Sequence, residues 1–333
     1  MPSTTFFAVR IQSVPLDRPL PFDIAILVAG NHVVFRREKE ILTQERLESL
    51  LQKGLKSFYI SEDHRGQYRA FLKQAVQNDT LPVEQRGKYV KESAFNHITD
   101  LFTQPNVGQL AEDSKGLVED MVNFISSDIS AAVKLMGLSS HDYYTYNHCV
   151  NVSVYSISIA KRVVGDDKSL LMTAGLGGLL HDLGKKMVDD KIINKPGKLD
   201  ENEWAEMKRH PTHGVELLKG VANVSEDAKR VVHEHHEHLD GTGYPRGITD
   251  ESISQLSRIA AIADVFDALT TKRSYKEAMT AELALDVMLK MSPGKFDPNI
   301  FRYFEKRIPT KQDLEAEKGK DPCAPGFAVK KAG

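Results

Sequence analysis

The stretch HHEHLDGTGYP at residues 235–245 places three histidines and two acids directly before a Gly-x-Gly-Tyr-Pro turn. Imidazole and carboxylate groups are common protein ligands of divalent metals, although a solvated polar loop rich in histidine would show the same residues. The rest of the chain favours a metal site. Nine of the 12 histidines fall between His141 and His238, where their neighbours are acids and glycines at predicted helix ends.

Acids inside apolar runs give a second indication of a metal. His181 and Asp182 end the run SLLMTAGLGGLLHD, while Asp264 and Asp267 lie within RIAAIADVFDALT. Burying a carboxylate is costly without a partner, and a metal cation is the simplest one. A single buried acid could instead bond to the backbone or to an arginine, and His148 taken alone is more typical of a core residue. Several such residues on apolar helices together favour metal binding.

The elements that must position these side chains are helices. Helical periodicity extends almost throughout residues 82–310, with proline and glycine confined to junctions. Asp200 and Glu203 form a capping-box pattern that begins one helix, and His210 lies at the end of that helix, just before a proline. This part of the chain is therefore predicted to be all-α.

Residues 5–79 have a different pattern, in which short β-like runs alternate with two amphipathic helical runs. Gly30 and Asn31 are predicted to form a tight hairpin turn. Thr43 is predicted to cap the first helix and Gly54 to end it. We divide the chain into an α+β N-terminal domain with a regulatory role (1–81), a helical linker (82–140), a helical catalytic domain (141–310) and a flexible tail (311–333).

Composition excludes several classes of function. With 44 Lys and Arg against 46 Asp and Glu, the net charge of -2 favours neither a nucleic acid polymer nor a membrane surface as partner. Cys149 and Cys323 lie in unlike contexts, which argues against a disulfide framework. The first residues lack a signal-peptide pattern, and no run of about 18 apolar residues occurs. We expect a cytoplasmic chain without membrane insertion.

The motifs HDLGK (181–185), HP (210–211), HHEHLDGTGYP (235–245) and IADVFDALTTKRSYK (262–276) resemble those of the HD-GYP family, a branch of the HD-domain phosphohydrolases. The resemblance covers about residues 130–307 and includes both motifs that give the family its name. It implies an α-helical HD bundle that carries a di- or trinuclear metal site and hydrolyses the bacterial second messenger cyclic di-GMP.

The resemblance also implies roles for individual residues. The metal ligands would be His148, His181, Asp182, His210, His235, His236 and Asp264, with Asp182 as the bridge between two metals. Lys185 would lie beside the reacting phosphate, and Tyr244, Arg273 and Lys276 would hold the dinucleotide. Members with a third metal carry a glutamate four residues before the first histidine. Here that position is Tyr144, so two metals are expected.

The donor types suggest a chemistry independently of the resemblance. A set of histidines and carboxylates without thiolate suits iron or manganese better than structural zinc. Two such ions can share a hydroxide and stabilise an in-line displacement at phosphorus. Asp182 and Lys185 are the predicted catalytic residues, because Lys185 could offset charge on the phosphoryl oxygens; a solvated lysine at a helix end is the alternative.

The predicted function is hydrolysis of cyclic di-GMP to pGpG, with GMP as a further product. Two alternatives stay open: a non-catalytic receptor for a cyclic dinucleotide that signals through protein contacts, and a phosphodiesterase for cyclic GMP-AMP. The expected partners are cyclic di-GMP and other signalling proteins, and a homodimer is an open alternative to a monomer.

Overall fold

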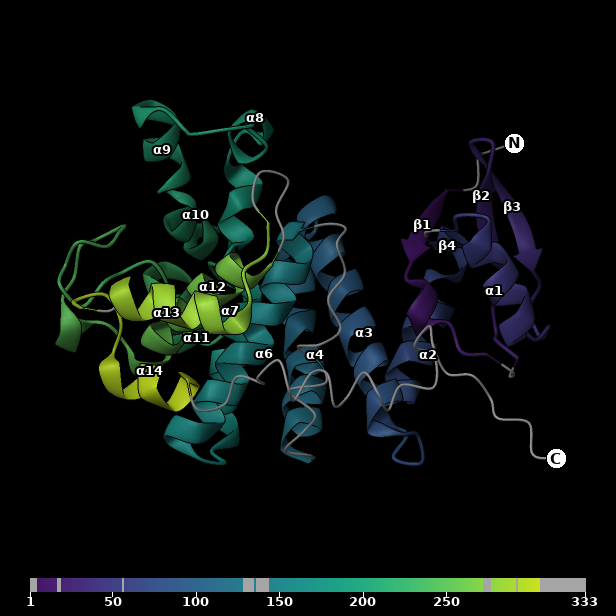
Figure 1. The fold of residues 1–333 in the computed structure, drawn as a ribbon, viewed down its shortest axis with the longest axis horizontal. Coiled ribbons are helices and arrows are strands. Elements are labelled where there is room, and N and C mark those ends of the chain that lie inside the picture. The colour runs from purple at the N-terminus through teal and green to yellow at the C-terminus, as the bar shows by residue number, and fades with distance from the viewer. Residues whose placement is uncertain are drawn as a thin grey trace. The chain divides into compact units, whose positions relative to one another are not determined.

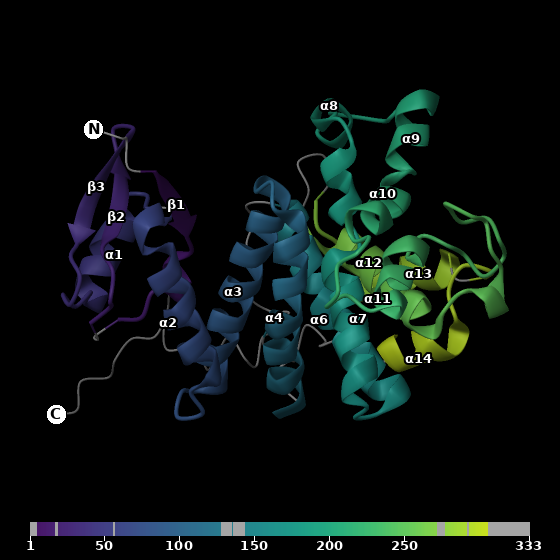
Figure 2. The same ribbon diagram turned by 180° about the vertical axis from the view of Figure 1, so that it is seen from behind.

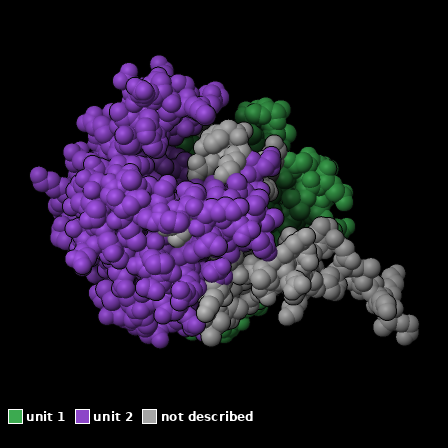
Figure 3. All heavy atoms as spheres, turned by 60° about the vertical axis from the view of Figure 1, so that its left-hand side comes forward, with its two compact units in different colours: residues 1–97 green, residues 98–333 purple. Residues whose placement is uncertain are grey.

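The structure is a computed structural model, and it describes residues 5–16, 19–55, 57–127, 135, 144–271, 277–291 and 293–305. Within this description, the side chains of Gln12 and Tyr144 are left out. The chain forms two compact units, Met1–His97 (unit 1) and Ile98–Gly333 (unit 2), which Figure 3 draws in different colours.

Unit 1 contains an antiparallel sheet with the strand order β1-β4-β2-β3. Its strands are β1 (Phe6–Val9), β2 (Ile24–Val28), β3 (Asn31–Arg36) and β4 (Phe58–Ser61), and its helices include α1 (Gln44–Gln52) and α2 (Arg65–Gln77). Phe58 and Ile60 are fully buried, whereas Tyr59 between them is half-buried, as the period of two along a strand requires. The predicted α+β character of this region is confirmed.

The hairpin between β2 and β3 turns one residue earlier than predicted. Its two turn residues are Ala29 and Gly30, with φ values of 48° and 80°, and Asn31 already pairs with Val28 in the ladder. The prediction of a turn at Gly30 and Asn31 was therefore wrong by one residue. The apolar alternation of the strands sets the register, and the turn accepts an alanine in the left-handed region to keep that register.

The boundaries of α1 follow the predicted signals. The Thr43 side chain accepts a hydrogen bond from the backbone N–H of Arg46 at 3.3 Å, which satisfies one of the unpaired N–H groups of the first turn. Gly54 follows the C-cap residue with a φ of 84°, a conformation that glycine adopts without a steric penalty. Both predictions are confirmed.

In the described residues of unit 2 the named secondary-structure elements are all helices (Figures 1 and 2). Helix α3 (Val83–Thr103) crosses the division between the units and enters unit 2. The longer helices that follow are α4 (Val107–Ser127), α6 (Tyr144–Val164), α7 (Lys168–Leu180), α12 (Gln255–Thr270) and α13 (Ala281–Met291). The shorter ones are α8 (Asp190–Ile193), α9 (Glu201–Met207), α10 (His210–Leu217), α11 (Glu226–Glu234) and α14 (Pro298–Glu305), with a 3-10 turn η3 (Leu183–Met187) after α7.

Helix α7 is the centre of unit 2, because α6, α11, α4 and α12 all pack against it. Glycines allow two of these approaches to be close. A Cβ at Gly177 would overlap the side chain of Val231 in α11, and one at Gly178 would meet the backbone of Ser153 in α6 at 3.0 Å. The close packing brings the histidines of α6 and α11 next to His181 at the end of α7. The predicted α-helical bundle is confirmed.

The segment 82–140, which we predicted to be a linker, contains α3 and α4, and α4 packs against α7 and α6. The predicted tail at 311–333 lies outside the described residues, so its flexibility stays a prediction, as do the functional roles of the predicted parts. Cys149 is a buried free thiol. Among the described residues, no helix is long and apolar enough to cross a membrane.

Candidate metal centre

Three helices of unit 2 end near a histidine whose ring bonds back to the end of the helix that precedes it. In each case Nδ1 lies 2.8 Å from the carbonyl oxygen three residues earlier in the chain. The three are His181 after α7, His210 after α9 and His235 after α11. The last carbonyls of a helix have no partner within it, and a carbonyl can only accept. Nδ1 is therefore the donor in all three rings, and in the neutral ring Nε2 carries the lone pair.

His148 on α6 is oriented by a carboxylate instead. Its Nδ1 lies 2.7 Å from Oδ2 of Asp267, a residue that is only 1% exposed. Asn151 donates a hydrogen bond to the other oxygen of Asp267 at 2.8 Å. Nε2 of His148 points toward His181, with 3.3 Å between the two Nε2 atoms. Asp267 therefore holds His148 by its outer nitrogen and aims the inner nitrogen at the other imidazoles.

Asp182 lies between two pairs of imidazoles. Its Oδ2 is 3.4 Å from Nε2 of His181 and 3.7 Å from Nε2 of His148, while its Oδ1 is 3.4 Å from Nε2 of His210. Lys185 donates a hydrogen bond to Oδ2 at 2.6 Å. Burial alone raises the pKa of Asp182, but the charges of Lys185 and His181 bring that pKa well below its usual value. The carboxylate is thus ionised, and Oδ1 is buried and accepts no hydrogen bond from the described residues.

Asp264 on α12 contacts two of the imidazoles. Its Oδ1 lies 3.0 Å from Nε2 of His148, and its Oδ2 lies 3.6 Å from Nδ1 of His236. Burial raises the pKa of Asp264, yet the hydrogen bond from His148 outweighs burial and lowers it. Burial also lowers the pKa of His236 to about 4, so this imidazole is neutral at pH 7.

These donor atoms form three overlapping groups, each with its atoms within 4.8 Å of one another. The groups are His148 with His181 and Asp264, His181 with Asp182 and His235, and His210 with His235 and His236. We call these seven residues the donor cluster. All seven residues predicted to be metal ligands are brought together in it.

The donor cluster fits a cation and fits poorly without one. Nε2 of His210 and Nε2 of His235 face each other at 3.2 Å. Burial lowers the pKa of both rings, that of His210 to about 3, so two lone pairs would meet with no proton between them. The other pair of facing rings is His148 and His181. Burial lowers the pKa of His148, but the hydrogen bonds to Asp264 and Asp267 outweigh burial and raise this pKa to about 9. His148 therefore keeps its proton unless a divalent ion displaces it.

The Gly-Tyr-Pro turn folds back over the donor cluster. The backbone N–H of Tyr244 donates to the carbonyl of His236 at 3.1 Å, and a Cβ at Gly243 would overlap the backbone of residues 236–238. The Tyr244 ring lies 4.6 Å from the His236 ring, tilted by 35°. Only glycine at position 243 permits this approach, so the turn sets the distance between the tyrosine and the cluster.

Three buried acids support the site, although none of them is among the seven predicted metal ligands. Glu237 accepts the backbone N–H of Arg246 at 2.7 Å and that of Ile248 at 3.2 Å, which holds the segment after the turn. Glu234 accepts from Arg246 at 2.6 Å and from the Ser257 hydroxyl at 2.8 Å, and Asp267 orients His148. An acid in an apolar run was a visible signal for Asp267, but its partner is 119 residues away in the sequence.

Some predicted residues lie outside the described part of the chain, and two further histidines lie apart from the cluster. Arg273 and Lys276 lie outside the described residues, and so does the side chain of Tyr144. His213 approaches Glu216 at 3.4 Å, and His238 pairs with the Thr242 hydroxyl at 2.9 Å. Neither histidine belongs to the groups that form the donor cluster.

Residues 132–300 match the HD domain family. A cyclic di-GMP phosphodiesterase of Pseudomonas aeruginosa is 39% identical over 215 residues, which are 63% of this chain and 51% of that protein. The cyclic di-GMP phosphodiesterase response regulator RpfG of Xanthomonas campestris pv. campestris is 30% identical over 294 residues, covering 88% of this chain and 68% of the relative. The chain belongs to the HD-GYP branch of the HD-domain family.

The fold of this HD-GYP chain also occurs in a solved structure. An HDG"Y"P protein from Bdellovibrio bacteriovorus superposes with a TM-score of 0.72 at 22% identity, over 91% of this chain and 99% of the other. A 3′3′-cGAMP-specific phosphodiesterase of Vibrio cholerae is 38% identical over 165 residues, covering 50% of this chain and 35% of that relative. The chain therefore spans about half the length of the Pseudomonas relative and about a third of the Vibrio one.

Proposed function

We propose that this chain is a metal-dependent phosphodiesterase that hydrolyses cyclic di-GMP to the linear dinucleotide pGpG, with GMP as a product if pGpG is cleaved in turn. The observation that carries the proposal is the donor cluster, where buried imidazole lone pairs and carboxylate oxygens converge in groups whose atoms lie within 4.8 Å of one another. Membership of the HD-GYP branch supports the same reading, as do the relatives whose names state this activity.

The seven residues of the donor cluster would hold two divalent ions. His148, His181 and Asp264 would serve one ion and His210, His235 and His236 the other, since these are two of the three groups whose atoms lie within 4.8 Å. Asp182 would bridge them, because its two oxygens face different imidazole pairs. The mixed nitrogen and oxygen donors, without a thiolate among them, favour iron or manganese.

When bound, the ions would lower the pKa of a water molecule and withdraw charge from the phosphodiester. The chain's own residues would orient the phosphodiester and select the substrate. Lys185, held 2.6 Å from Asp182, would place a positive charge beside the phosphoryl oxygens. Tyr244 would form a wall of the cleft above His236. Arg273 and Lys276 are proposed, from the sequence alone, to hold the rest of the dinucleotide.

Two other functions remain candidates. A receptor that binds a cyclic dinucleotide without cleaving it would use the same cleft and signal through protein contacts. A phosphodiesterase for cyclic GMP-AMP is favoured by the Vibrio cholerae relative named for that substrate. The complete donor cluster argues for the first proposal over the receptor, since binding alone does not require every group that would hold the metals.

The test is a product assay on the full chain, purified without oxygen and analysed for metal. We expect about two iron or manganese ions per chain and conversion of cyclic di-GMP to pGpG. Metal-free protein that cleaves as fast as the loaded protein would contradict the metal role. Faster cleavage of cyclic GMP-AMP would move the assignment to that substrate, and tight binding without cleavage by fully loaded protein would favour the receptor.

The remaining proposals concern the cell. The N-terminal region would regulate the HD-GYP part, because the donor cluster lies wholly in unit 2 and separate domains commonly divide such tasks. A buried free thiol at Cys149 is compatible with a reducing cytoplasm. Signalling proteins as partners and a homodimer stay proposals that size measurements and pull-down experiments on the full chain can test.

A further inference from the structure

Trp204 is the single tryptophan of the chain and remains 45% exposed. It lies on α9, which with α8 stands out from the rest of unit 2 at the top of Figure 1. A tryptophan has a large apolar surface whose burial would be favourable. Trp204 therefore has exposed aromatic surface that a ligand can cover.

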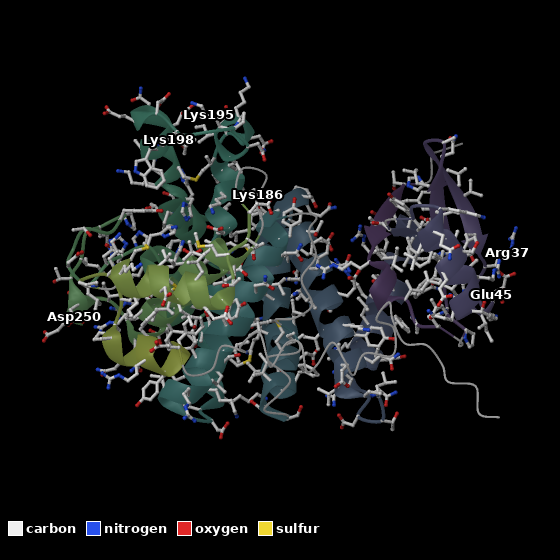
Figure 4. All side chains as sticks on the ribbon, viewed as in Figure 1. Arg37, Glu45, Lys186, Lys195, Lys198 and Asp250 are labelled. Carbon is white, nitrogen blue, oxygen red and sulfur yellow. The ribbon has the colours of Figure 1, made fainter. Side chains whose placement is uncertain are left out.

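The backbone under Trp204 is firmly held. Asp200 and Glu203 form a reciprocal capping box at the start of α9. Lys195 donates hydrogen bonds to both carboxylate oxygens of Glu203, at 2.7 and 2.5 Å, which ties the preceding turn to the helix. Figure 4 labels Lys195 and Lys198, which lie in the segment between α8 and α9. Because the helix is anchored at its first turn, the indole is carried by a rigid element and not by a loose loop.

Trp204 also ends a line of aromatic rings that begins in the donor cluster. The rings of His235 and His236 lie 4.1 Å apart, those of His236 and Tyr244 4.6 Å, and those of Tyr244 and Trp204 5.9 Å. The last contact is nearly perpendicular, with 78° between the planes, so it covers only part of the indole. A ligand whose phosphate sits at the cluster would meet Trp204 on the far side of Tyr244.

The charges near Trp204 favour a base over a phosphate as its partner. The Lys195 ammonium is paired with Glu203, and the Arg209 guanidinium lies 3.1 Å from Glu206, which is also on α9. Residues 195–209 carry four Lys and Arg against four Asp and Glu, so the surface around the indole offers a flat aromatic group and little net charge. Stacking on an aromatic side chain is the usual way in which proteins hold an unpaired nucleobase.

We propose that Trp204 stacks against a purine base of the bound cyclic dinucleotide while the phosphodiester lies at the donor cluster. The inference rests on the proposed function, since it assumes that the ligand of this cleft carries purine bases. Stacking recognises the face of a base and tolerates either purine. Trp204 therefore contributes to the affinity for the dinucleotide and does not separate cyclic di-GMP from cyclic GMP-AMP.

The lone tryptophan makes the proposal directly measurable. In a stopped-flow experiment on the full, metal-loaded chain, cyclic di-GMP should quench the indole fluorescence before product forms, with an amplitude that saturates with ligand. Dimethyl phosphate, a phosphodiester without bases, should leave the signal unchanged. Binding of cyclic di-GMP with no change in fluorescence would overturn the proposal.

Steady-state kinetics supply a second measurement. Trp204→Ala should raise KM for cyclic di-GMP and for cyclic GMP-AMP by the same factor, about tenfold, which is the size expected for one stacked base. Trp204→Phe should recover most of that loss. The rate with bis-p-nitrophenyl phosphate should fall far less, because this substrate does not extend past Tyr244. The matched control is Tyr303→Ala, an equally exposed aromatic on α14, at the other end of unit 2 from α9 (Figures 1 and 2).

The outcomes separate this inference from the proposed function. A chain that shows the fluorescence change but no cleavage would keep the stacking contact and remove the enzyme activity. Cleavage with unchanged kinetics in Trp204→Ala would keep the enzyme and remove the stacking contact. Equal losses on all three substrates, with a matching loss of metal, would mean that Trp204 supports the fold of the site, and the proposal would be wrong.

Discussion

The donor cluster and the rim above it, which we define as Tyr244 and Trp204, are held by different means. Five of the seven cluster residues are less than 2% exposed, and four of its imidazoles are tethered through Nδ1, three to a carbonyl and one to a carboxylate. The rim consists of a turn residue and a helix residue that contact each other through ring edges. The cluster is thus prearranged for a cation, while the rim is open to a larger ligand.

This difference implies that the cluster serves cleavage and the rim serves binding of the dinucleotide. Two substrates of different size can distinguish these roles. Bis-p-nitrophenyl phosphate is small enough to report on the cluster alone, whereas a cyclic dinucleotide needs both regions. Changes in the cluster should reduce turnover of both substrates, and changes near the rim should mainly raise KM for the dinucleotide. If changes in the cluster and changes near the rim alter turnover and KM in the same way, the two regions do not differ in function.

The largest effect is expected for Asp182→Ala. Because Asp182 faces both imidazole pairs, its loss should lower metal content and reduce kcat/KM for both substrates by about 1,000-fold or more. Metal analysis, both rate assays and circular dichroism would check this, and the helical signal should persist. Full activity with metal retained would remove Asp182 from the mechanism.

Asp267→Asn tests whether orientation of a ligand matters as well as the ligand itself. Asn keeps the shape of the side chain but removes the charge that His148 Nδ1 meets at 2.7 Å. Loss of such outer contacts commonly costs about 10- to 100-fold in metal affinity or activity, and both substrates should be affected equally. Asp166→Asn, at an exposed position on the surface, is the matched control, and a loss confined to the dinucleotide would contradict the assignment.

Arg273→Ala tests a dinucleotide contact that is proposed from the sequence alone, since this residue lies outside the described part of the chain. If Arg273 holds the second half of the dinucleotide, KM for cyclic di-GMP should rise about tenfold or more, the size of one charge-assisted contact. Cleavage of bis-p-nitrophenyl phosphate should change little. Equal losses on both substrates would mean that Arg273 supports the metal site or the fold.

Glu237→Gln should have a smaller effect of the same kind. Glu237 accepts two backbone N–H groups after the Gly-Tyr-Pro turn, and a neutral amide accepts them less strongly. Weakening a hydrogen bond of this type costs about 1 kcal/mol, so KM for the dinucleotide should rise by a few-fold with metal content unchanged. Loss of metal in this variant would show that the turn and the cluster are not separable.

The smallest change in the balance between the substrates is expected when residues 1–81 are removed. The donor cluster lies in unit 2 and α3 begins only at Val83, so the shortened chain should still bind metal and cleave. Regulation by the N-terminal region should alter both rates by a common factor. A folded, metal-loaded chain that has lost all chemistry would show that the N-terminal region takes part in catalysis.

Much of the fold could be predicted because its signals are local. The caps at Thr43 and Asp200 act within three residues of themselves, and the apolar run of α7 predicted a buried helix that ends in His181 and Asp182. The hairpin turn was misplaced because Ala29 carries no turn signal, and its positive φ follows from strand pairing. The ligand types were likewise visible in the residues and motifs, although their roles remain to be tested.

The amino-acid sequence by itself determined which donors are available, which helices carry them and which family the chain resembles. Only the tertiary structure decided that Asp267 holds His148, that the two oxygens of Asp182 face different imidazole pairs, and that Trp204 meets Tyr244. Caps and periodicity arise from contacts within one or two helical turns, so they can be read along the chain. Contacts between residues 28 to 119 positions apart depend on how α6, α7, α9, α11 and α12 are packed, and no short stretch of sequence contains that information.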